Sequence, residues 1–201
     1  MTRPTWAALL AIASLSSLVQ IAAADSPDEK AILDVLDAGV GAQLDSDFPR
    51  LASLLRPSSQ HLFRDQLSAR FDELLRVYSF EQISAVSGLP AHPKDLNLSD
   101  PEFFVFACEQ ARARHPDFVG DPKNLPFDIR GSIFHGENLV DVALSYTRHV
   151  HTERADYSFT LPFVIVLQRQ EARWQILSCP LAHVIAYNWS HDLACPAAPS
   201  R

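Results

Sequence analysis

The sequence predicts an α+β protein in which N-terminal helices pack against a strongly curved antiparallel sheet of three to five strands. Two observations support this prediction. Apolar residues recur every three or four positions through the first half of the chain, which is the period of an amphipathic helix. Between Leu125 and Cys179 they alternate with polar residues, which is the period of a strand with one buried face. Helices followed by sequential strands are the order of an α+β fold.

The N-terminus has the pattern of a secretory signal peptide. One positive charge, Arg3, precedes an apolar run from Trp6 to Ile21, and three alanines follow that run. We expect cleavage of residues 1–24 after Ala24. This predicts a secreted or periplasmic protein that is not attached to a membrane once the signal peptide is removed.

The remainder of the chain has a suitable length for one domain with a single core. We expect residues 25–195 to form that domain, with a helical insertion around 63–115, and residues 196–201 to be a disordered tail. Removal of Arg3 with the signal peptide leaves 16 of the 17 Lys and Arg residues and all 24 Asp and Glu residues. The expected net charge of the mature chain is therefore −8. A negative surface disfavours nucleic acid and anionic membranes, so neither is an expected partner.

Five helices are predicted before the sheet, each from a start signal and a stop signal. Serine with Glu or Gln three residues later, the pattern of a capping box, occurs at Ser26, Ser79 and Ser99. The second helix is expected from Phe48 to Leu55, before Pro57, and Ser58 or Ser59 is expected to cap the third. In the third helix we expect an apolar stripe on one side and exposed charged residues, Arg64 among them, on the other. The stripe consists of Phe63, Leu67, Phe71, Leu74, Leu75 and Tyr78.

The predicted sheet begins with a hairpin. Phe127, Ile129 and Ile133 alternate with polar residues, so we expect all three on one face of the first strand. Residues 135–138 supply a polar reversal that contains a glycine. The second strand is expected to place four alternate apolar residues on one face: Val140, Val142, Leu144 and Tyr146.

A longer strand is predicted from Tyr157 to Gln168, followed by a turn and a last strand that begins near Trp174. Val164 and Val166 are apolar on the face opposite the other apolar residues of the long strand. We therefore expect this end of the strand to be covered on both sides. Pro162 cannot donate to a strand ladder, so a bulge or an unpaired N–H is expected there.

The segment Pro162–Arg169 followed by Arg173–Leu177 resembles the paired closing strands of the nuclear transport factor 2-like superfamily, where a tryptophan after the turn begins the last strand. The helices within Lys30–Pro57 and the strands within Phe127–Ser178 are similar to the same family. The resemblance implies a curved antiparallel sheet wrapped round helices into a cone. Some members are ketosteroid isomerases, dehydratases or polyketide cyclases, and others are binding or accessory domains. The isomerases' Tyr and Asp constellation has no match here, so no catalytic role is carried over.

Asp141 is the candidate catalytic residue. It lies with Ser145 and Thr147 on the face of its strand opposite Val140 and Val142. If that face lines the interior of a cone, a buried Asp141 would suit a general base. If the face is solvated, Asp141 is an ordinary surface carboxylate, and this second interpretation is favoured.

His149, His151 and Glu153 are candidate metal ligands, because residues two apart on a strand share a face. Two imidazoles and a carboxylate suit zinc or iron. The favoured alternative is a polar, solvated hairpin end, since Arg148 and Arg154 beside these residues would repel a cation. We therefore expect no metal.

The chain has three cysteines. Cys179 and Cys195 are predicted to form a disulfide in an oxidising compartment, which would contribute about 3 kcal/mol by loop entropy. Cys108 lies on the apolar side of its helix and is expected to be a buried, unreactive thiol. In the C-terminal tail, Tyr187 and Trp189 are expected to pack on the core while the neighbouring histidines stay exposed.

The sequence contains no Gly-rich phosphate loop, no Gly-x-Ser-x-Gly and no His-Glu-x-x-His. No cofactor is therefore expected. We predict a non-catalytic binding or accessory module that holds a small apolar ligand or a protein partner. The alternative is an isomerase, dehydratase or cyclase that uses a buried carboxylate or histidine, with Asp141 the first candidate. A homodimer through the outer face of the sheet is a third possibility.

Overall fold

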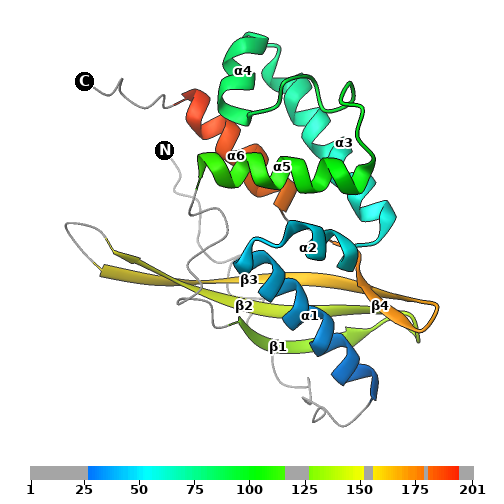
Figure 1. Ribbon diagram of the computed structural model, residues 1–201. Coiled ribbons are helices and arrows are strands. Elements are labelled where there is room, and N and C mark those ends of the chain that lie inside the picture. Colours follow the sequence, from blue (N-terminus) through cyan, green and yellow to red (C-terminus); the bar gives the residue numbers. More distant parts are fainter. Residues whose placement is uncertain (1–26, 116–126, 152–155, 179–180, 195–201) are drawn as a thin grey trace, which may run out of the picture.

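The computed structural model describes residues 27–115, 127–151, 156–178 and 181–194 (Figure 1). These residues form six helices and one four-stranded antiparallel sheet, which confirms the α+β prediction. The elements are α1 Pro27–Asp45, α2 Phe48–Leu54, α3 Pro57–Leu74, α4 Phe80–Ser87, α5 Asp100–Arg114, β1 Phe127–Phe134, β2 Leu139–His151, β3 Asp156–Gln170, β4 Arg173–Ile176 and α6 Leu181–Ala194.

The sheet has the strand order β1-β2-β3-β4 and is open, since β1 and β4 are its two edges. The long strands β2 and β3 pair without a register shift from Leu139 opposite Gln168 to His151 opposite Asp156. Pro162 therefore makes no bulge. It lies outside the part of β3 that pairs with β4, where a strand position without an N–H is tolerated.

A bulge in β1 makes one prediction about its faces wrong. The register of β1 against β2 shifts at Arg130, an extra residue on the β1 side. Ile129 lies opposite Leu144, whereas Ile133 lies opposite Asp141, on the other face of β2. Ile133 is consequently 59% exposed instead of buried. One inserted residue moves every later side chain of a strand to the opposite face.

The coverage of β3 also differs from the prediction. Val164 is 56% exposed, although we expected this end of the strand to be covered on both sides. The helices cover one face only. There Val140 of β2, Leu167 of β3 and Ile176 of β4 form one row of paired, buried residues.

Helix α1 crosses the buried face of the sheet and packs on β4 (Figure 1). Gly39 is the point of close approach: a Cβ at this position would lie 3.2 Å from the Cδ1 atom of Ile176. At the start of α1, Asp28 accepts a hydrogen bond from Arg169 Nη1 at 3.1 Å. The helix is thus held to the sheet by packing in its middle and by an ion pair at its N-terminus.

Helices α3, α4, α5 and α6 pack together on the side of α2 away from the sheet (Figure 1). Their shared core is aromatic: Phe63 lies 4.8 Å from Phe104 and Phe71 lies 6.2 Å from Trp189 between ring centroids. Cys108 is a fully buried thiol in α5, as predicted. The predicted insertion therefore forms most of a separate helical layer.

Two predictions about this layer are wrong. Trp189 packs in the core as predicted, at 2% exposed, but Tyr187 does not: it is two residues away and on the other side of helix α6, and it is 68% exposed. Helix α3 begins at Pro57 without a side-chain cap. The hydroxyl of Ser59, an expected cap, instead donates to the backbone oxygen of Leu177 at 2.8 Å.

Candidate functional site

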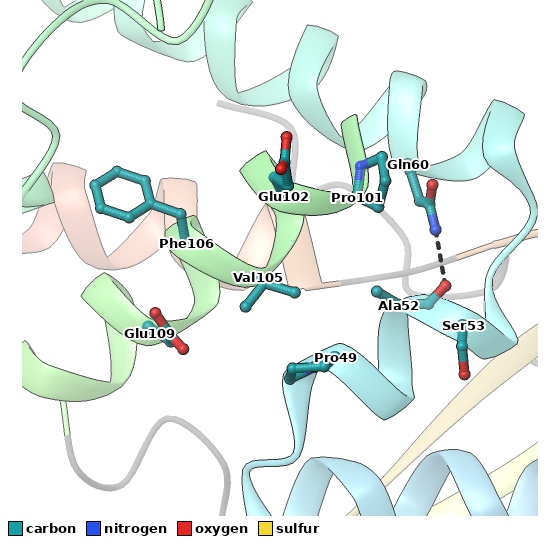
Figure 2. Close-up of a pocket in the computed structure, with 9 residues that line it drawn as sticks. All are labelled: Pro49, Ala52, Ser53, Gln60, Pro101, Glu102, Val105, Phe106 and Glu109. Atoms are coloured by element: carbon teal, nitrogen blue, oxygen red, sulfur yellow. Dashed lines mark hydrogen bonds between the residues drawn. The ribbon is translucent and has the colours of Figure 1, made fainter. Parts of the chain in front are cut away.

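The candidate site is a groove of about 460 Å³ between α2 and α5 (Figure 2). Helix α2 supplies one wall, α5 supplies the other, and the first turns of α3 close one end. Nine residues line this α2–α5 groove: Pro49, Ala52, Ser53, Gln60, Pro101, Glu102, Val105, Phe106 and Glu109. Its volume lies within the range of about 300–1,000 Å³ that is usual for sites that bind small molecules.

Local helix signals place these side chains. Pro49 and Pro101 lie in the first turns of α2 and α5, where the fixed φ of proline favours a helix start. The Gln60 amide donates to the backbone oxygen of Ala52 at 2.7 Å, which joins the start of α3 to α2 (Figure 2). Val105 is only partly buried, so an apolar side chain is left facing the groove.

The rim of the groove is acidic. Glu102 and Glu109 are seven residues apart on α5, which places their Cα atoms about 10 Å apart along the helix. Glu102 accepts hydrogen bonds from Ser99 Oγ at 2.6 Å and from Ser99 N at 2.8 Å. These bonds, the side-chain bond first, lower the pKa of Glu102 and keep its carboxylate ionised at neutral pH. None of the nine lining residues is basic.

This arrangement suits recognition better than bond chemistry. The lining residues include neither histidine, cysteine nor lysine, and the two carboxylates are too far apart to share a proton. An apolar surface between two negative charges can hold an apolar group that carries or adjoins a positive charge.

The structure places Asp141 outside the groove. It lies on the face of β2 opposite Val140 and Val142, away from α1, and its side chain is 36% exposed. Asp141 Oδ2 lies 2.9 Å from Nε2 of His135, which is in the β1–β2 turn. The face that Asp141 occupies is thus the one that α1 leaves open, and the carboxylate is neutralised by a histidine when that histidine is protonated.

The other predicted site residues fall at the limits of the described chain. His149 and His151 belong to β2, but only their backbone is described, and Glu153 lies outside the described residues. Cys179 and Cys195 also lie outside them. The bridge between these two cysteines therefore stays a prediction.

The described part of the chain contains further histidine–aspartate pairs that sequence reasoning missed, and His92 and His115 belong to two of them. His92 Nε2 lies 3.1 Å from Asp72 Oδ1, and its Nδ1 accepts a hydrogen bond from the backbone N–H of Lys94 at 3.1 Å. With both ring nitrogens engaged, His92 has no site left for acid–base work. His115 Nε2 lies 2.9 Å from Asp192 Oδ2 and links the end of α5 to α6.

Within the described ranges, no group of three or more His, Cys, Asp or Glu residues could hold a metal ion. Across those same ranges, no helix combines the length and apolar character needed to cross a membrane.

Sequence reasoning named none of the nine groove residues as a candidate site residue, and Glu102 entered only as part of a capping box. The groove joins residues up to 60 positions apart, from Pro49 to Glu109, and no local period reveals such a meeting. The signal that was present is the i, i+7 spacing of Glu102 and Glu109, which puts two acidic residues on one side of a helix beside an apolar pair.

Comparison with known proteins finds no matching family model, no matching curated protein and no matching solved structure.

Proposed function

We propose that this chain is an exported, non-catalytic binding module and that its α2–α5 groove holds an apolar group with a positive charge. The observation that supports the proposal is that two partly buried apolar residues, Val105 and Phe106, and two exposed acidic residues, Glu102 and Glu109, line the same groove. The ligand is either a small apolar cation or a basic, apolar segment of a protein partner. Both present the same chemistry to the groove.

Calorimetric titration of the mature chain with two probes tests this proposal. One probe is phenethylammonium, and the other is a short peptide in which leucines lie between two lysines. We expect one or both to bind with a Kd between about 10 µM and 1 mM, the range open to a shallow site of this size. If neither probe saturates the protein, the proposal is wrong. The probe that binds more tightly shows whether the ligand is a small apolar cation or a basic segment of a protein partner.

Glu109→Lys is the decisive variant, because Glu109 is an exposed rim residue and Glu102 also serves as a helix cap. We expect this variant to lose about tenfold or more in affinity for the cationic probe, since an attraction becomes a repulsion. Glu137→Lys makes the same change of charge in the exposed β1–β2 turn and should leave the affinity unchanged. Equal losses in the two variants would show that only net charge matters.

We further propose that the protein is exported and belongs to the nuclear transport factor 2-like superfamily. The signal pattern in residues 1–24 supports export. Helix α1 on one face of a four-stranded antiparallel sheet supports the family, whose cone requires a strongly curved sheet. Intact-mass analysis of the exported protein should find a chain that begins at Asp25, and an experimental structure of that chain would measure the curvature of the sheet.

The rival function is an isomerase, dehydratase or cyclase. The contact of Asp141 with His135 at 2.9 Å is the observation that favours it, because a carboxylate can orient an imidazole as a general base. Its test is exchange of α-protons of cyclic ketones in D2O, followed by NMR. Exchange catalysed by the wild type and abolished by Asp141→Asn would replace the binding proposal with the rival.

A further inference from the structure

The α2–α5 groove offers a ligand more hydrogen-bond acceptors than donors. Among its nine lining residues, only Ser53 and Gln60 have a side chain that can donate. Ser53 Oγ donates to the backbone oxygen of Arg50 at 2.7 Å. One N–H of the Gln60 amide donates to Ala52 O at 2.7 Å, which leaves its second N–H as the last side-chain donor of the lining. The acceptors include the Gln60 amide oxygen and both glutamates, so a ligand that brings its own N–H donors suits this groove.

Gln60 is the acceptor that the fold holds in one orientation. The residue is only 7% exposed. Only the nitrogen of an amide can donate to a backbone oxygen, so the bond to Ala52 O fixes which atom of the amide is which. Gln60 Oε1 therefore points away from Ala52 (Figure 2). No residue of the described chain donates to Oε1, and the atom keeps accessible surface in the groove that Gln60 lines.

This unpaired oxygen can distinguish ligands that charge alone cannot. A ligand that covers the groove displaces water from Oε1, and it has to replace the lost hydrogen bond or bind less tightly. The attraction of Glu102 and Glu109 depends on charge and distance, so it acts alike on all ammonium ions of similar size. A hydrogen bond to Gln60 Oε1 requires an N–H on the ligand, which a quaternary ammonium lacks.

We infer that Gln60 determines the specificity of the α2–α5 groove and selects an ammonium ion with at least one N–H over a quaternary ammonium. This inference rests on the proposed function, the binding of an apolar cation in the groove. The ammonium donates to Gln60 Oε1, the two glutamates compensate its charge, and the apolar group packs on Val105 and Phe106. In a protein partner the corresponding group is the side chain of a lysine.

Calorimetric titration of the mature chain with phenethylammonium and its N,N-dimethyl and N,N,N-trimethyl derivatives tests the inference. All three carry one positive charge at neutral pH and the same phenyl group, but only the trimethyl compound lacks an N–H. We expect its Kd to be at least about tenfold higher than that of the dimethyl compound. Without the hydrogen bond, an added methyl group would leave the Kd unchanged or lower it, because the apolar area grows. If the leucine–lysine peptide is the tighter probe, dimethyllysine and trimethyllysine in place of its lysines give the same comparison.

Two substitutions assign the effect to the oxygen of Gln60. Gln60→Met and Gln60→Glu both lose the bond to Ala52 O, but only the methionine variant also loses the acceptor. The difference in Kd between the dimethyl and trimethyl compounds should disappear in Gln60→Met and persist in Gln60→Glu. A purely structural role of Gln60 would change the affinity for both compounds equally and leave their ratio intact.

The possible outcomes separate this inference from the proposed function. If the trimethyl compound binds the wild type as tightly as the dimethyl compound, the inference about Gln60 is wrong and the proposed function stands. The inference is also wrong if the ratio of the two Kd values persists in Gln60→Met, since another acceptor then receives the N–H. The comparison on the wild type needs no variant, so an unstable Gln60→Met does not prevent a decision. Binding of no ammonium ion and no peptide would mean that the proposed function itself is wrong.

Discussion

Arg64 holds the connector between α4 and α5 in place. Its guanidinium donates to three backbone oxygens of that connector: to Pro93 at 3.1 Å, to Leu96 at 2.6 Å and to Leu98 at 2.7 Å. It also lies 3.2 Å from Asp100 Oδ1, at the start of α5. The side chain is only 14% exposed, so the charge is compensated mainly by these acceptors and not by water.

Arg64→Ala should lower the free energy of unfolding by about 2–4 kcal/mol, because it leaves three backbone acceptors without their donor. Arg64→Lys should recover only part of that loss, since an ammonium cannot reproduce the planar fork of the guanidinium. Urea unfolding of both variants measures the effect. Arg112→Ala removes an exposed arginine from α5 and should change stability by less than about 0.5 kcal/mol. Similar losses in all three variants would refute the role given to Arg64.

Glu102 makes the start of α5 sensitive to pH. The hydrogen bonds from Ser99 hold the pKa of Glu102 below its ordinary value of 4.5. A lowered folded-state pKa means that the ionised carboxylate stabilises the fold above about pH 4.5 and that this contribution is lost as the pH falls through the folded-state value. The stability difference between wild type and Glu102→Gln should therefore be largest near neutral pH and shrink on acidification.

Denaturant titrations of both proteins between about pH 7 and pH 3 measure this difference. Glu109→Gln removes a carboxylate from the same helix without touching the bonds of Ser99. The Glu109→Gln variant therefore shows how much of the change in stability comes only from the loss of one negative charge on α5. A stability difference that does not change with pH would contradict the assigned cause.

Single residues were the scale at which sequence reasoning was least informative. The capping box of Ser99 and Glu102 was predictable, because both members lie within four residues of each other. Arg64 was expected to face the solvent, since its position on α3 flanks the apolar stripe. Its acceptors lie about 30 residues further along the chain, in a connector without a repeating pattern, so no local period could reveal them.

At the scale of elements, the contact of α1 with β4 depends on a small residue. Gly39 and Gly41 are both inside α1, where alanine is favoured over glycine by about 1 kcal/mol. A Cβ at Gly41 would meet no atom within 4 Å, whereas one at Gly39 would lie 3.2 Å from Ile176 Cδ1. A glycine-to-alanine substitution therefore adds a methyl group to a packed contact at Gly39 and to open space at Gly41.

Gly41→Ala should raise the free energy of unfolding by about 0.5–1 kcal/mol through helix propensity. Gly39→Ala should give a smaller gain or a loss, because Ile176 has to shift within the core. Parallel urea titrations of the two variants measure the difference. Equal stabilisation by both would show that α1 does not pack on β4 as closely as the structure indicates.

Elements with a sustained period were predictable, and elements that depend on one inserted residue were not. The alternation of Val140, Val142 and Leu144 correctly placed these residues in the core. The bulge at Arg130 leaves the alternation of β1 intact in the sequence but inverts its faces, so Ile133 was assigned to the wrong side. Helix α6 was missed, although Leu181, Ile185 and Trp189 have the spacing of one helix face.

At the scale of the whole molecule, one junction connects the sheet to the helical layer. Arg56 N, between α2 and α3, donates to the backbone oxygen of Ile176 at 3.1 Å, and Leu55 forms an isolated bridge with the same residue. Ser59 Oγ donates to Leu177 O at 2.8 Å. These contacts join positions more than 110 residues apart, so neither the sheet nor the helical layer can unfold without breaking them.

This junction predicts a single cooperative unfolding transition. The predicted mature chain has two tryptophans, one in each layer: Trp174 in β4 is 5% exposed and Trp189 in α6 is 2% exposed. Trp174→Phe leaves a reporter of the helical layer, and Trp189→Phe leaves a reporter of the sheet. In each variant the urea midpoint from fluorescence should coincide with the midpoint from far-UV circular dichroism, because a single tryptophan then reports on the whole molecule. The comparison is made within one variant, so any loss of stability from the substitution itself cancels.

Ser59→Ala extends this test, because it removes one bond of the junction and leaves both tryptophans in place. If the layers unfold as a unit, the fluorescence and circular dichroism midpoints should fall together, by an amount that corresponds to about 1–2 kcal/mol. Separate midpoints in the wild type would mean that the layers are independent. Separate midpoints in Ser59→Ala alone would mean that this hydroxyl is what couples them.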